Sequence, residues 1–598
     1  MSGYNDTFDV VVVGGGHGGI EASLAAARMG LKTLFVTQSI DSIGRMSCNP
    51  SIGGIAKGNI VKEIDALGGE MGKLIDKSLI QFRLLNKSRG PAVQAPRAQA
   101  DKLLYATLAR KTVETQENLA TLQDTIVGIE TEDYFDKELN QNRRKLTALI
   151  SARGRKIITH SAVLTTGTFL AGKIFIGEFE EDNGRLGEPG AYGLSDSLRN
   201  LGFSLGRLKT GTPPRVLKSS LDFSKMEIQD GDEEIIPFSF DDEVVDRPMV
   251  PCYLVYTNEE THKMIRDNIH YSPLYSGKIQ GIGPRYCPSI EDKVMRFPDR
   301  ERHQLFVEPE GIDTEEMYIN GFSSSLPEAI QDKFMRTLPG FENAIVTRPG
   351  YAVEYDYIEP TQLYSSLETK LVSGLFSAGQ INGTSGYEEA AGQGLIAGIN
   401  AGLYVQAQRT AEKNCIVSYE PLVLKRSEAY IGVLIDDLVT LGTKEPYRMF
   451  TARAEHRLKL RHDTADERLV EYAFKVGLKT EEQYRKVQKK IADKQEILAL
   501  LKKNSSAKNP GFDEKIWEQA QIDYKYEHYI TKQDKRVEKL KRMENTKIPV
   551  DFDYGSIPSL SNESRQKLEK IRPTTLGQAN RISGIRNSDI MLLMVYLK

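Results

Sequence analysis

A glycine-rich turn between a short apolar strand and a helix does most to limit the folds open to this chain. Residues 10–13 are consecutive valines, residues 20–29 predict an alanine-rich helix, and the turn before that helix consists of Gly14, Gly15, Gly16, His17, Gly18 and Gly19. In such a Gly-x-Gly-x-x-Gly turn the glycines permit a tight bend, let a pyrophosphate reach the backbone, and let the helix pack on the strand. With a second strand at 33–36, the sequence predicts an α/β, Rossmann-type domain that binds a dinucleotide.

Two points at this turn stay open. The alternative, a glycine-rich turn that binds nothing, fits the complete order of strand, turn, helix and strand less well. The second strand ends in Thr37, Gln38 and Ser39, where an acidic residue normally holds the ribose. The pattern therefore predicts the class of ligand and leaves the ribose contact open.

Length and composition limit the remaining classes. A chain of 598 residues is long enough for roughly three to four domains. Its net charge is −3, so any surface that binds nucleic acid is expected as a local patch. No run approaches the ~18 apolar residues of a membrane span, and residues 1–7 show no targeting signal. The four cysteines are widely spaced, so the sequence predicts neither a metal site nor disulfides. It predicts a cytoplasmic location without membrane attachment.

Composition and element patterns divide the chain into predicted domains. The first α/β domain is discontinuous and comprises residues 1–205 and 350–410. An inserted α/β domain is expected over residues 206–349, where a rigid basic loop leads into an acidic, β-rich section. Beyond residue 410 the sequence becomes helical and charged, which predicts a helical region over 411–550 and a terminal helical bundle over 551–598.

Residues 81–97 combine basic side chains with residues that interrupt regular structure. Gly90, Pro91 and Pro96 predict an ordered loop here rather than a helix or strand. Arg89 and Arg97 would then be held on this loop, where they could contact phosphates or the edge of a flavin ring. A merely solvated turn is the alternative.

Two cysteines stand in similar surroundings. Cys48 lies on a loop rich in proline and glycine, and Cys287 precedes Pro288 with Arg285 and Lys293 nearby. Pro288 in the first turn of a short helix would place Cys287 at the N-cap, where the helix dipole and the cations favour a thiolate. Both cysteines are therefore candidate catalytic residues, with an inert, partly buried thiol as the alternative.

A third glycine-rich segment follows a strand near the middle of the chain. Residues 379–394 are rich in glycine and small polar residues, and a Gly/Ala-rich helix follows over residues 395–406. The N-terminus of that helix would face negative charge on a cofactor, so the segment predicts a second cofactor contact. A packing helix without a ligand is the alternative.

The segment 446–462 interleaves basic and aromatic side chains, as a surface that follows a phosphate backbone does. The predicted RNA contacts are Arg448, Arg453, Arg457 and Arg461. A solvated charged face is the alternative.

Several long, ungapped stretches carry a resemblance that runs nearly end to end. They include GRMSCNPSIGGIAKG at 44–58, GRLKTGTPPR at 206–215, GPRYCPSIEDKVMRF at 283–297, GQINGTSGYEEAAGQG at 379–394 and NRISGI at 580–585. Together with GGGHGG at 14–19 they resemble the MnmG (GidA) family, the flavin subunit of the bacterial system that modifies the wobble uridine of tRNA.

The resemblance implies site residues and partners. FAD would lie on the glycine turn, with a backbone contact near Val127 and polar contacts from Ser195 and Gln380. NADH would bind at residues 283–297, at Gly283, Pro284, Arg285, Tyr286, Lys293, Arg296 and Phe297. It also implies functional roles for Cys48 and Cys287, a homodimer, and a heterotetramer with the GTPase MnmE, which supplies methylenetetrahydrofolate. His456 stands where the family usually has a tyrosine.

The function implied is an FAD- and NADH-dependent enzyme that, with MnmE, adds a (carboxymethyl)aminomethyl group to C5 of the wobble uridine of tRNA. A folate- and FAD-dependent tRNA uridine methyltransferase is one alternative, although it is shorter and lacks the long helical tail. A pyridine-nucleotide flavoprotein reductase without RNA is another, against which stand the missing CxxxxC pair and the arginine-rich segment. A binding protein that uses FAD only structurally is a third.

Overall fold

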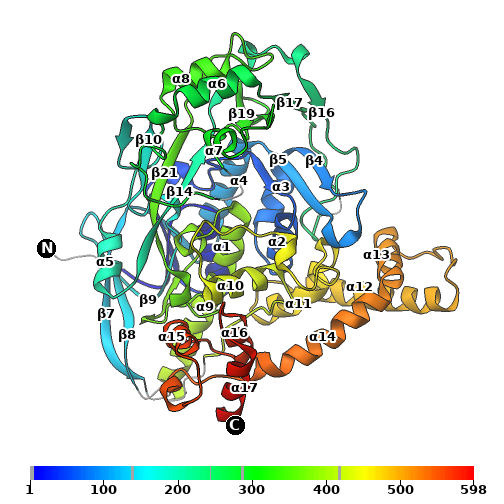
Figure 1. Cartoon of the computed structure of the whole chain (residues 1–598). Coiled ribbons are helices and arrows are strands. Elements are labelled where there is room, and N and C mark those ends of the chain that lie inside the picture. The colour runs from blue at the N-terminus through cyan, green and yellow to red at the C-terminus, as the bar shows by residue number, and fades with distance from the viewer. Residues whose placement is uncertain (1–5, 137–140, 243, 285–287, 415–418, 598) are drawn as a thin grey trace.

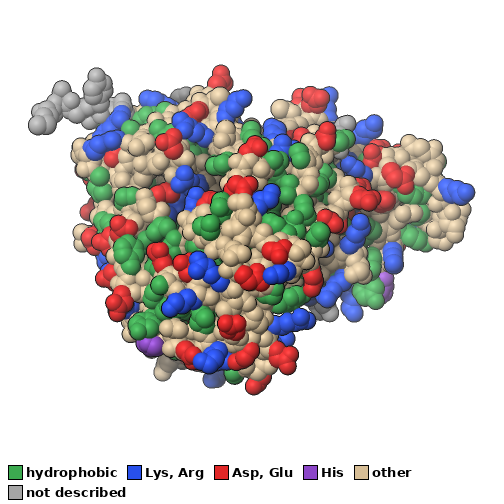
Figure 2. Space-filling model, turned by 90° about the horizontal axis from the view of Figure 1, so that it is seen from above, with side chains coloured by type: hydrophobic (Ala, Val, Ile, Leu, Met, Phe, Trp, Pro, Cys, Tyr) green, Lys and Arg blue, Asp and Glu red, His purple; other side chains and the backbone are tan. Residues whose placement is uncertain are grey.

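The structure is a computed structural model that describes residues 6–136, 141–242, 244–284, 288–414 and 419–597 (Figure 1). Across these ranges no helix is both long enough and apolar enough to cross a membrane. On the face shown in Figure 2, acidic and basic side chains are interspersed among apolar ones, as the small net charge would suggest.

The glycine turn belongs to a central, mostly parallel sheet of eight strands. Its main strand order is β22-β8-β9-β1-β2-β6, with β23 paired to β9 and β7 paired to β8. The strands are β1 (Asp6–Val13), β2 (Thr33–Thr37), β6 (Leu119–Gln123), β7 (Ile126–Asp136), β8 (Gln141–Ser151), β9 (Lys156–Leu164), β22 (Val372–Ser373) and β23 (Leu375–Ser377). Val10, Val11 and Val12 are fully buried at its centre, as a parallel strand covered on both faces requires.

Two helices that are far apart in sequence pack together on this sheet. They are α1 (His17–Arg28) and α9 (Tyr387–Asn414). A Cβ added to Gly394 would lie 2.1 Å from the carbonyl oxygen of Gly18, and one added to Gly398 would lie 2.4 Å from that of Ala22. The glycines of α9 therefore let its backbone approach that of α1, which brings the two glycine-rich segments of the sequence together.

The central sheet is connected to the inserted segment through a pair of long antiparallel strands. These are β14 (Leu205–Thr212) and β21 (Tyr351–Ile358), which pair from Leu205–Ile358 to Thr212–Tyr351. They form a four-stranded sheet with β10 (Lys173–Ile176) and β11 (Phe179–Glu181), beside the small hairpin of β12 (Asn183–Arg185) and β13 (Glu188–Pro189).

The chain between β14 and β21 forms a separate six-stranded antiparallel sheet. Its order is β16-β17-β18-β19-β15-β20. The strands are β15 (Arg215–Leu217), β16 (Glu227–Gln229), β17 (Cys252–Tyr256), β18 (Gln304–Pro309), β19 (Glu316–Asn320) and β20 (Val346–Arg348). Its helices α6 (Glu259–Asp267), α7 (Ile290–Arg296) and α8 (Glu328–Met335) lie at the top of Figure 1.

A three-stranded sheet lies beside the central one, and it corrects one sequence-based prediction. It consists of β3 (Ser51–Gly53), β5 (Ala95–Ala100) and β4 (Leu79–Leu85) in that order. The prediction of a loop over residues 81–97 is therefore wrong at both ends, although residues 86–94 do form a connection. The helices nearby are α2 (Lys57–Ala66), α3 (Met71–Ser78) and α4 (Lys102–Thr115), whereas α5 (Leu194–Asn200) packs against β7 of the central sheet.

The rest of the chain is helical. It comprises α10 (Tyr430–Leu441), α11 (Ala465–Lys475), α12 (Glu481–Lys503), α13 (Glu514–Lys525), α14 (Glu527–Asn545), α15 (Asn562–Ile571), α16 (Leu576–Arg581) and α17 (Asn587–Tyr596). Helices α12, α13 and α14 extend sideways from the body, and α14 runs back to the final helices (Figure 1). The predicted fold class, a Rossmann-type α/β unit with an inserted α/β segment and a helical C-terminal part, is confirmed.

We expect Gly394→Ala to destabilise the protein, because the new methyl group would force α9 away from Gly18. The expected loss is about 1–3 kcal/mol in the free energy of unfolding, seen as a lower melting temperature. Gly90→Ala is the control, since its Cβ would meet only the Tyr526 hydroxyl, at 3.8 Å. Equal melting temperatures for both variants would contradict the close helix contact.

Candidate functional site

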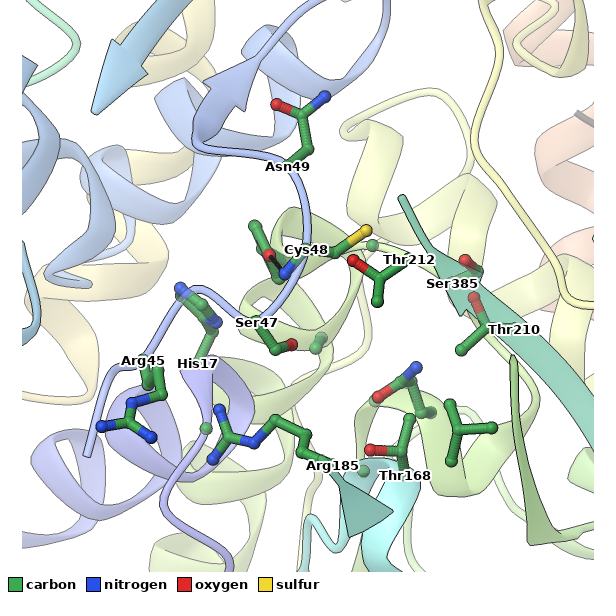
Figure 3. A pocket seen from close by; sticks show the side chains of 18 of the residues that line it. His17, Arg45, Ser47, Cys48, Asn49, Thr168, Arg185, Thr210, Thr212 and Ser385 are labelled. Atoms are coloured by element: carbon green, nitrogen blue, oxygen red, sulfur yellow. Dashed lines mark hydrogen bonds between the residues drawn. The ribbon is translucent and has the colours of Figure 1, made fainter. Parts of the chain in front are cut away.

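A cavity of about 1020 Å³ lies at the carboxyl ends of the central parallel strands (Figure 3). It is lined by the glycine turn, the loop after β2, the segment after β9, the ends of β14 and β21, the start of α9, and strands β18 and β19 of the six-stranded sheet. Open α/β sheets bind their ligands at this edge. The glycine turn, the Cys48 loop, the 379–394 segment and described residues of the 283–297 segment thus meet at a single cavity.

The glycines of the turn have different tasks. A Cβ on Gly14, which has a φ of +119°, would lie 2.3 Å from the Thr165 carbonyl oxygen, and one on Gly19 would lie 1.9 Å from that of Gly14. A Cβ on Gly16 would meet nothing within 4 Å. Gly16 is also the N-cap of α1 and provides no side-chain cap, so the first N–H groups of this helix are available to a phosphate.

Buried polar atoms beside the cavity fit a dinucleotide. Among the described residues, His17 Nε2, Thr166 Oγ1 and Ser195 Oγ are buried without a hydrogen-bond partner. Such atoms are costly to bury unless a ligand or water satisfies them. His17 and Thr166 line the cavity itself, and Gln380 joins them there. Ser195 lies next to the lining residue Leu194, so these residues fit the FAD expected from the sequence.

The region around Val127 supports the same placement. Gly193, just before α5, would place a Cβ 3.1 Å from Val127 Cβ, so this loop packs directly on the start of β7. The adjacent Ile126 lines the cavity. A backbone contact near Val127 therefore fits the shape of the site.

His17 is held as a neutral imidazole. Its ring stacks on Tyr387, with centroids 4.6 Å apart, and lies 5.6 Å from Tyr105. Burial lowers the pKa of His17 to about 4, so that the ring carries no charge at neutral pH. The ring can then donate or accept one hydrogen bond toward the cavity without adding charge.

The loop that follows Cys48 is attached to the start of α9. Lys57 Nζ lies 2.8 Å from Glu388 and 3.2 Å from Glu389, and the backbone N–H of Gly53 donates to Glu388 at 2.7 Å. Burial alone would lower the pKa of Lys57, but the two carboxylates outweigh it and raise that pKa. This charged cluster fixes the cysteine loop relative to the cofactor-facing helix.

Cys48 lines the cavity, and its backbone N–H, its carbonyl oxygen and its sulfur all make contacts. Its backbone N–H donates to the Tyr387 hydroxyl at 2.7 Å, and its carbonyl oxygen accepts from Lys102 Nζ at 3.3 Å. Its sulfur lies 2.9 Å from the Tyr318 hydroxyl and 3.8 Å from the Gly211 carbonyl oxygen. Figure 3 shows the Cys48 side chain directed toward Thr212.

The segment of the second cysteine contributes to the same cavity. Cys287, Arg285 and Tyr286 lie outside the described residues, whereas Pro284, Pro288 and Lys293 line the cavity. Gly283 is close to the Lys209 side chain, 3.4 Å from the position of an added Cβ. Arg296 and Phe297, by contrast, are exposed at the end of α7.

The predicted N-cap position of Cys287 is wrong. The N-cap of α7 is Ser289, whose hydroxyl accepts a hydrogen bond from the backbone N–H of Asp292. Serine is a strongly preferred N-cap residue, so the helix has its N-cap at Ser289 rather than two residues earlier. The helix consequently begins three residues after Cys287.

Cys252 provides a contrast to Cys48. It is 2% exposed, and its thiol donates to Gln81 Oε1 at 3.6 Å. Burial raises the pKa of Cys252 to about 12, so it is a neutral, enclosed thiol at physiological pH. Cys415 lies outside the described residues.

The four arginines of the basic segment are in different environments. Arg448 lines the cavity and Arg457 is exposed. Arg453 lies over the Tyr447 ring at 4.2 Å and remains partly exposed. Arg461 is 2% exposed and forms ion pairs with Asp463 at 2.9 Å and Asp523 at 2.7 Å, so the prediction that it contacts RNA is not supported by its burial.

Several residues of the site were not predicted as such. Arg185 lines the cavity from the β12–β13 hairpin, and Tyr318 reaches it from β19. Tyr387 lies within a glycine-rich segment that did attract notice, so its position at the start of α9 was a usable signal. Tyr318 lies on a short strand without any local motif. Among the described residues, no group of three or more His, Cys, Asp or Glu side chains is arranged to hold a metal ion.

Comparisons with known proteins agree with the resemblance seen in the sequence. The family model of glucose inhibited division protein A (GidA) matches residues 9–409, and the model of the tRNA modifying enzyme MnmG/GidA C-terminal helical bundle matches residues 536–598. The chain is 55% identical to the tRNA uridine 5-carboxymethylaminomethyl modification enzyme MnmG of Treponema pallidum (strain Nichols), over 99% of each chain. It is 49% identical to the enzyme of the same name from Geobacter sulfurreducens, over 100% of this chain and 98% of that one.

A solved structure has the same fold. GidA of Aquifex aeolicus, in its form I crystal, is 48% identical and superimposes with a TM-score of 0.91 over 99% of this chain and 100% of that one. In the form II crystal the identity is 46% and the TM-score 0.90, over 99% of this chain and 98% of that one.

We expect Gly16→Val to abolish FAD binding while the protein still folds. The space above Gly16 is open, so the new side chain would project into the phosphate position without a clash inside the protein. Flavin absorbance per chain after purification measures the effect, and the melting temperature of the flavin-stripped protein measures folding. Gly90→Val, whose added Cβ would meet only the Tyr526 hydroxyl at 3.8 Å, is the control for a glycine outside the cavity. Full flavin occupancy in Gly16→Val would contradict the assignment.

Proposed function

The chain belongs to the glucose inhibited division protein A (GidA) family, and from this membership we propose that it is a flavoenzyme that modifies C5 of the wobble uridine in tRNA. The group added would be a (carboxymethyl)aminomethyl group. The observation that carries this proposal is the position of Cys48, whose side chain lines the same cavity as the glycine turn and the start of α9 (Figure 3). A candidate nucleophile thus lies beside the cofactor position.

FAD fits the cavity through residues already described. The N-terminus of α1 would hold the pyrophosphate, and His17, Thr166, Ser195 and Gln380 would satisfy polar atoms of the cofactor. When bound, FAD would supply two-electron redox chemistry between NADH and the one-carbon unit of methylenetetrahydrofolate. The protein would orient these groups and exclude water from them.

The cysteine has a specific chemical task in this proposal. C5 of uracil is a weak nucleophile, and a thiolate that adds to C6 changes this. The S–C6 bond forms, and the electron pair of the C5–C6 double bond moves onto O4 as an enolate. After C5 has attacked the one-carbon unit, loss of the C5 proton and departure of the thiolate restore the ring. Glycine or ammonia would supply the amine nitrogen of the added group and would replace the folate nitrogen on the one-carbon unit. Whether Cys48 or Cys287 adds to C6 stays open.

The other cofactors and the domain division are part of the same proposal. We propose that residues 1–205 and 350–410 bind FAD, and that 206–349 bind NADH, for which Pro284 and Lys293 at the cavity wall are suitable contacts. The helical residues 411–550 and 551–598 would face tRNA and MnmE. A homodimer that joins MnmE in a heterotetramer, and a cytoplasmic location with the tRNA, complete the proposal.

The alternatives predict different products. A folate- and FAD-dependent methyltransferase would leave a methyl group on uridine, a flavin reductase would act without RNA, and a scaffold with structural FAD would not be reduced by NADH. Mass spectrometry of tRNA nucleosides from cells with and without this chain distinguishes the first two from our proposal. Anaerobic bleaching of the flavin by NADH tests the third.

Cys48→Ser and Cys287→Ser should abolish modification of the wobble uridine, because a hydroxyl is far less nucleophilic than a thiolate at neutral pH. Flavin content, NADH oxidation and tRNA binding should remain largely intact. The assay is modified uridine per tRNA in a single turnover with MnmE, the folate, NADH and glycine or ammonia. Cys252→Ser and Cys415→Ser are the controls and should be nearly silent. Normal product from either test variant would remove that cysteine from the mechanism.

Arg457→Glu should weaken tRNA binding and flatten its dependence on salt, by about one counterion per lost phosphate contact. Arg457 is suitable because it is exposed at the basic segment. Lys263→Glu makes the same charge change on α6, at a side chain that is 70% exposed, and serves as the control. Dissociation constants at several salt concentrations measure both. Equal curves for the two variants would identify the segment as a solvated face.

A further inference from the structure

The sulfur of Cys48 and the hydroxyl of Tyr318 are in direct contact. The two atoms are 2.9 Å apart, although the residues are 270 positions apart in the chain. Tyr318 is 2% exposed, and both side chains line the cavity. We propose that Tyr318 is a further catalytic residue, whose hydroxyl donates a hydrogen bond to the Cys48 thiolate and holds its sulfur toward the cavity.

Two cations lie near the tyrosine ring. The Arg215 guanidinium lies 5.0 Å from the ring centroid, and Lys102 Nζ lies 5.9 Å from it. Both cations share one counter-ion, because Glu310 Oε1 accepts from Arg215 Nε at 3.0 Å and from Lys102 Nζ at 2.7 Å. Two positive charges and one negative charge leave a net positive charge beside the sulfur. Such a setting attracts negative charge.

The pKa of Arg215 reflects the interaction of its guanidinium with the groups around it. Burial alone would lower the pKa of Arg215, but Glu310, Tyr318 and Cys48 outweigh it and raise that pKa. An attraction that stabilises the guanidinium equally stabilises negative charge on its neighbours. Burial lowers the pKa of Lys102 to about 8, although Glu310 raises it. Arg215 therefore keeps its positive charge to a higher pH than Lys102 does.

The backbone on both sides of the sulfur is fixed by the same residues. Arg215 donates to the Ser47 carbonyl oxygen at 2.8 Å, and Lys102 donates to the Cys48 carbonyl oxygen at 3.3 Å. Tyr387, the other hydroxyl at this residue, accepts the Cys48 N–H at 2.7 Å. With the peptide held in this way, the Tyr318 hydroxyl decides the direction of the sulfur. A nucleophile oriented before its substrate arrives reacts faster.

The role in the reaction rests on the proposed function and takes Cys48 as the cysteine that adds to C6. The hydroxyl keeps its own proton throughout. It donates to the thiolate before the S–C6 bond forms, releases it as the sulfur electrons enter that bond, and donates again when the thiolate leaves. No other acid or base is needed for this role.

The test is Tyr318→Phe in the full-length protein with FAD bound. This change removes the hydroxyl and retains the ring near the two cations. Alkylation of Cys48 by iodoacetamide, followed by mass spectrometry of its peptide, should slow about tenfold at neutral pH. The difference should disappear near about pH 10, where free thiols are largely ionised. Tyr253→Phe, on β17 of the same sheet, is the control, since the Tyr253 ring packs on Phe223.

A second variant guards against a folding defect. Difluorotyrosine at position 318 has nearly the shape of tyrosine, but its phenol ionises nearer neutral pH and then has no proton to donate. Cys48 alkylation relative to the natural protein should therefore fall as the pH rises through that ionisation. Equal alkylation rates for Tyr318→Phe and the natural protein, or no relative fall with difluorotyrosine, would overturn the inference.

Product formation separates this inference from the proposed function. In the single-turnover assay of modified uridine described above, Tyr318→Phe should form modified uridine about tenfold more slowly than the natural protein. Its flavin content and tRNA affinity should be unchanged. If the natural protein formed no modified uridine, the proposed function would fail, whereas the alkylation rates would still decide the contact. If Tyr318→Phe modified tRNA at the natural rate, its role in catalysis would be refuted.

Discussion

The approach of α9 to α1 is the contact on which the site depends. Gly394 and Gly398 remove the side chains that would otherwise separate the helices, so α9 lies directly on Gly18 and Ala22 of α1. Because α1 follows the glycine turn, its N-terminus and that of α9 open into the same cavity. The ion pairs from Lys57 to Glu388 and Glu389 then extend this geometry to the cysteine loop. A packing contact between backbones thus sets the position of the Cys48 loop relative to the glycine turn.

Buried carboxylates connect this centre to the helices around it. Glu21 of α1 accepts the backbone N–H groups of Glu70 and Met71, at the start of α3. Glu63 of α2 accepts those of Tyr430 and Ile431, at the start of α10. These helix ends have no partners of their own for their first N–H groups. A distant acidic side chain therefore both satisfies a helix end and fixes its position, which joins the C-terminal helices to the first domain.

The sequence was informative where a local pattern has a local cause. The strand, glycine turn and helix at residues 10–29 are determined by neighbours in the chain. The same holds for the glycine-rich segment at the start of α9. The expected loop at 81–97 failed because prolines can be accommodated in strands. Pro96 pairs with Leu84 of β4 near the start of β5, and its carbonyl oxygen accepts the Gly54 N–H at 2.8 Å, so the strand accommodates this proline.

Long-range partners were the part that the sequence could not supply. Nothing in the basic segment distinguishes Arg461 from Arg457, because the difference is Asp523, 62 positions later, which pairs with Arg461. The N-cap of α7 is Ser289 because its hydroxyl accepts the backbone N–H of Asp292. The pattern around Cys287 did not indicate this contact. Tyr318 became visible only through its distance to Cys48. Motifs therefore located the cavity, and contacts identified how the residues that line it are held.

The pairing of β14 with β21 has a consequence for how such a chain can change in length. Thr210 and Thr212 on β14 pair with Val353 and Tyr351 on β21, and all four line the cavity. Side chains alternate between the two faces of a strand, so one residue inserted within either strand would turn this face away from the cavity. Residues added to a loop between β15 and β20 would leave the ladder untouched. The inserted segment can thus grow or shrink at its loops, while the two strands that carry it must keep their length to the residue.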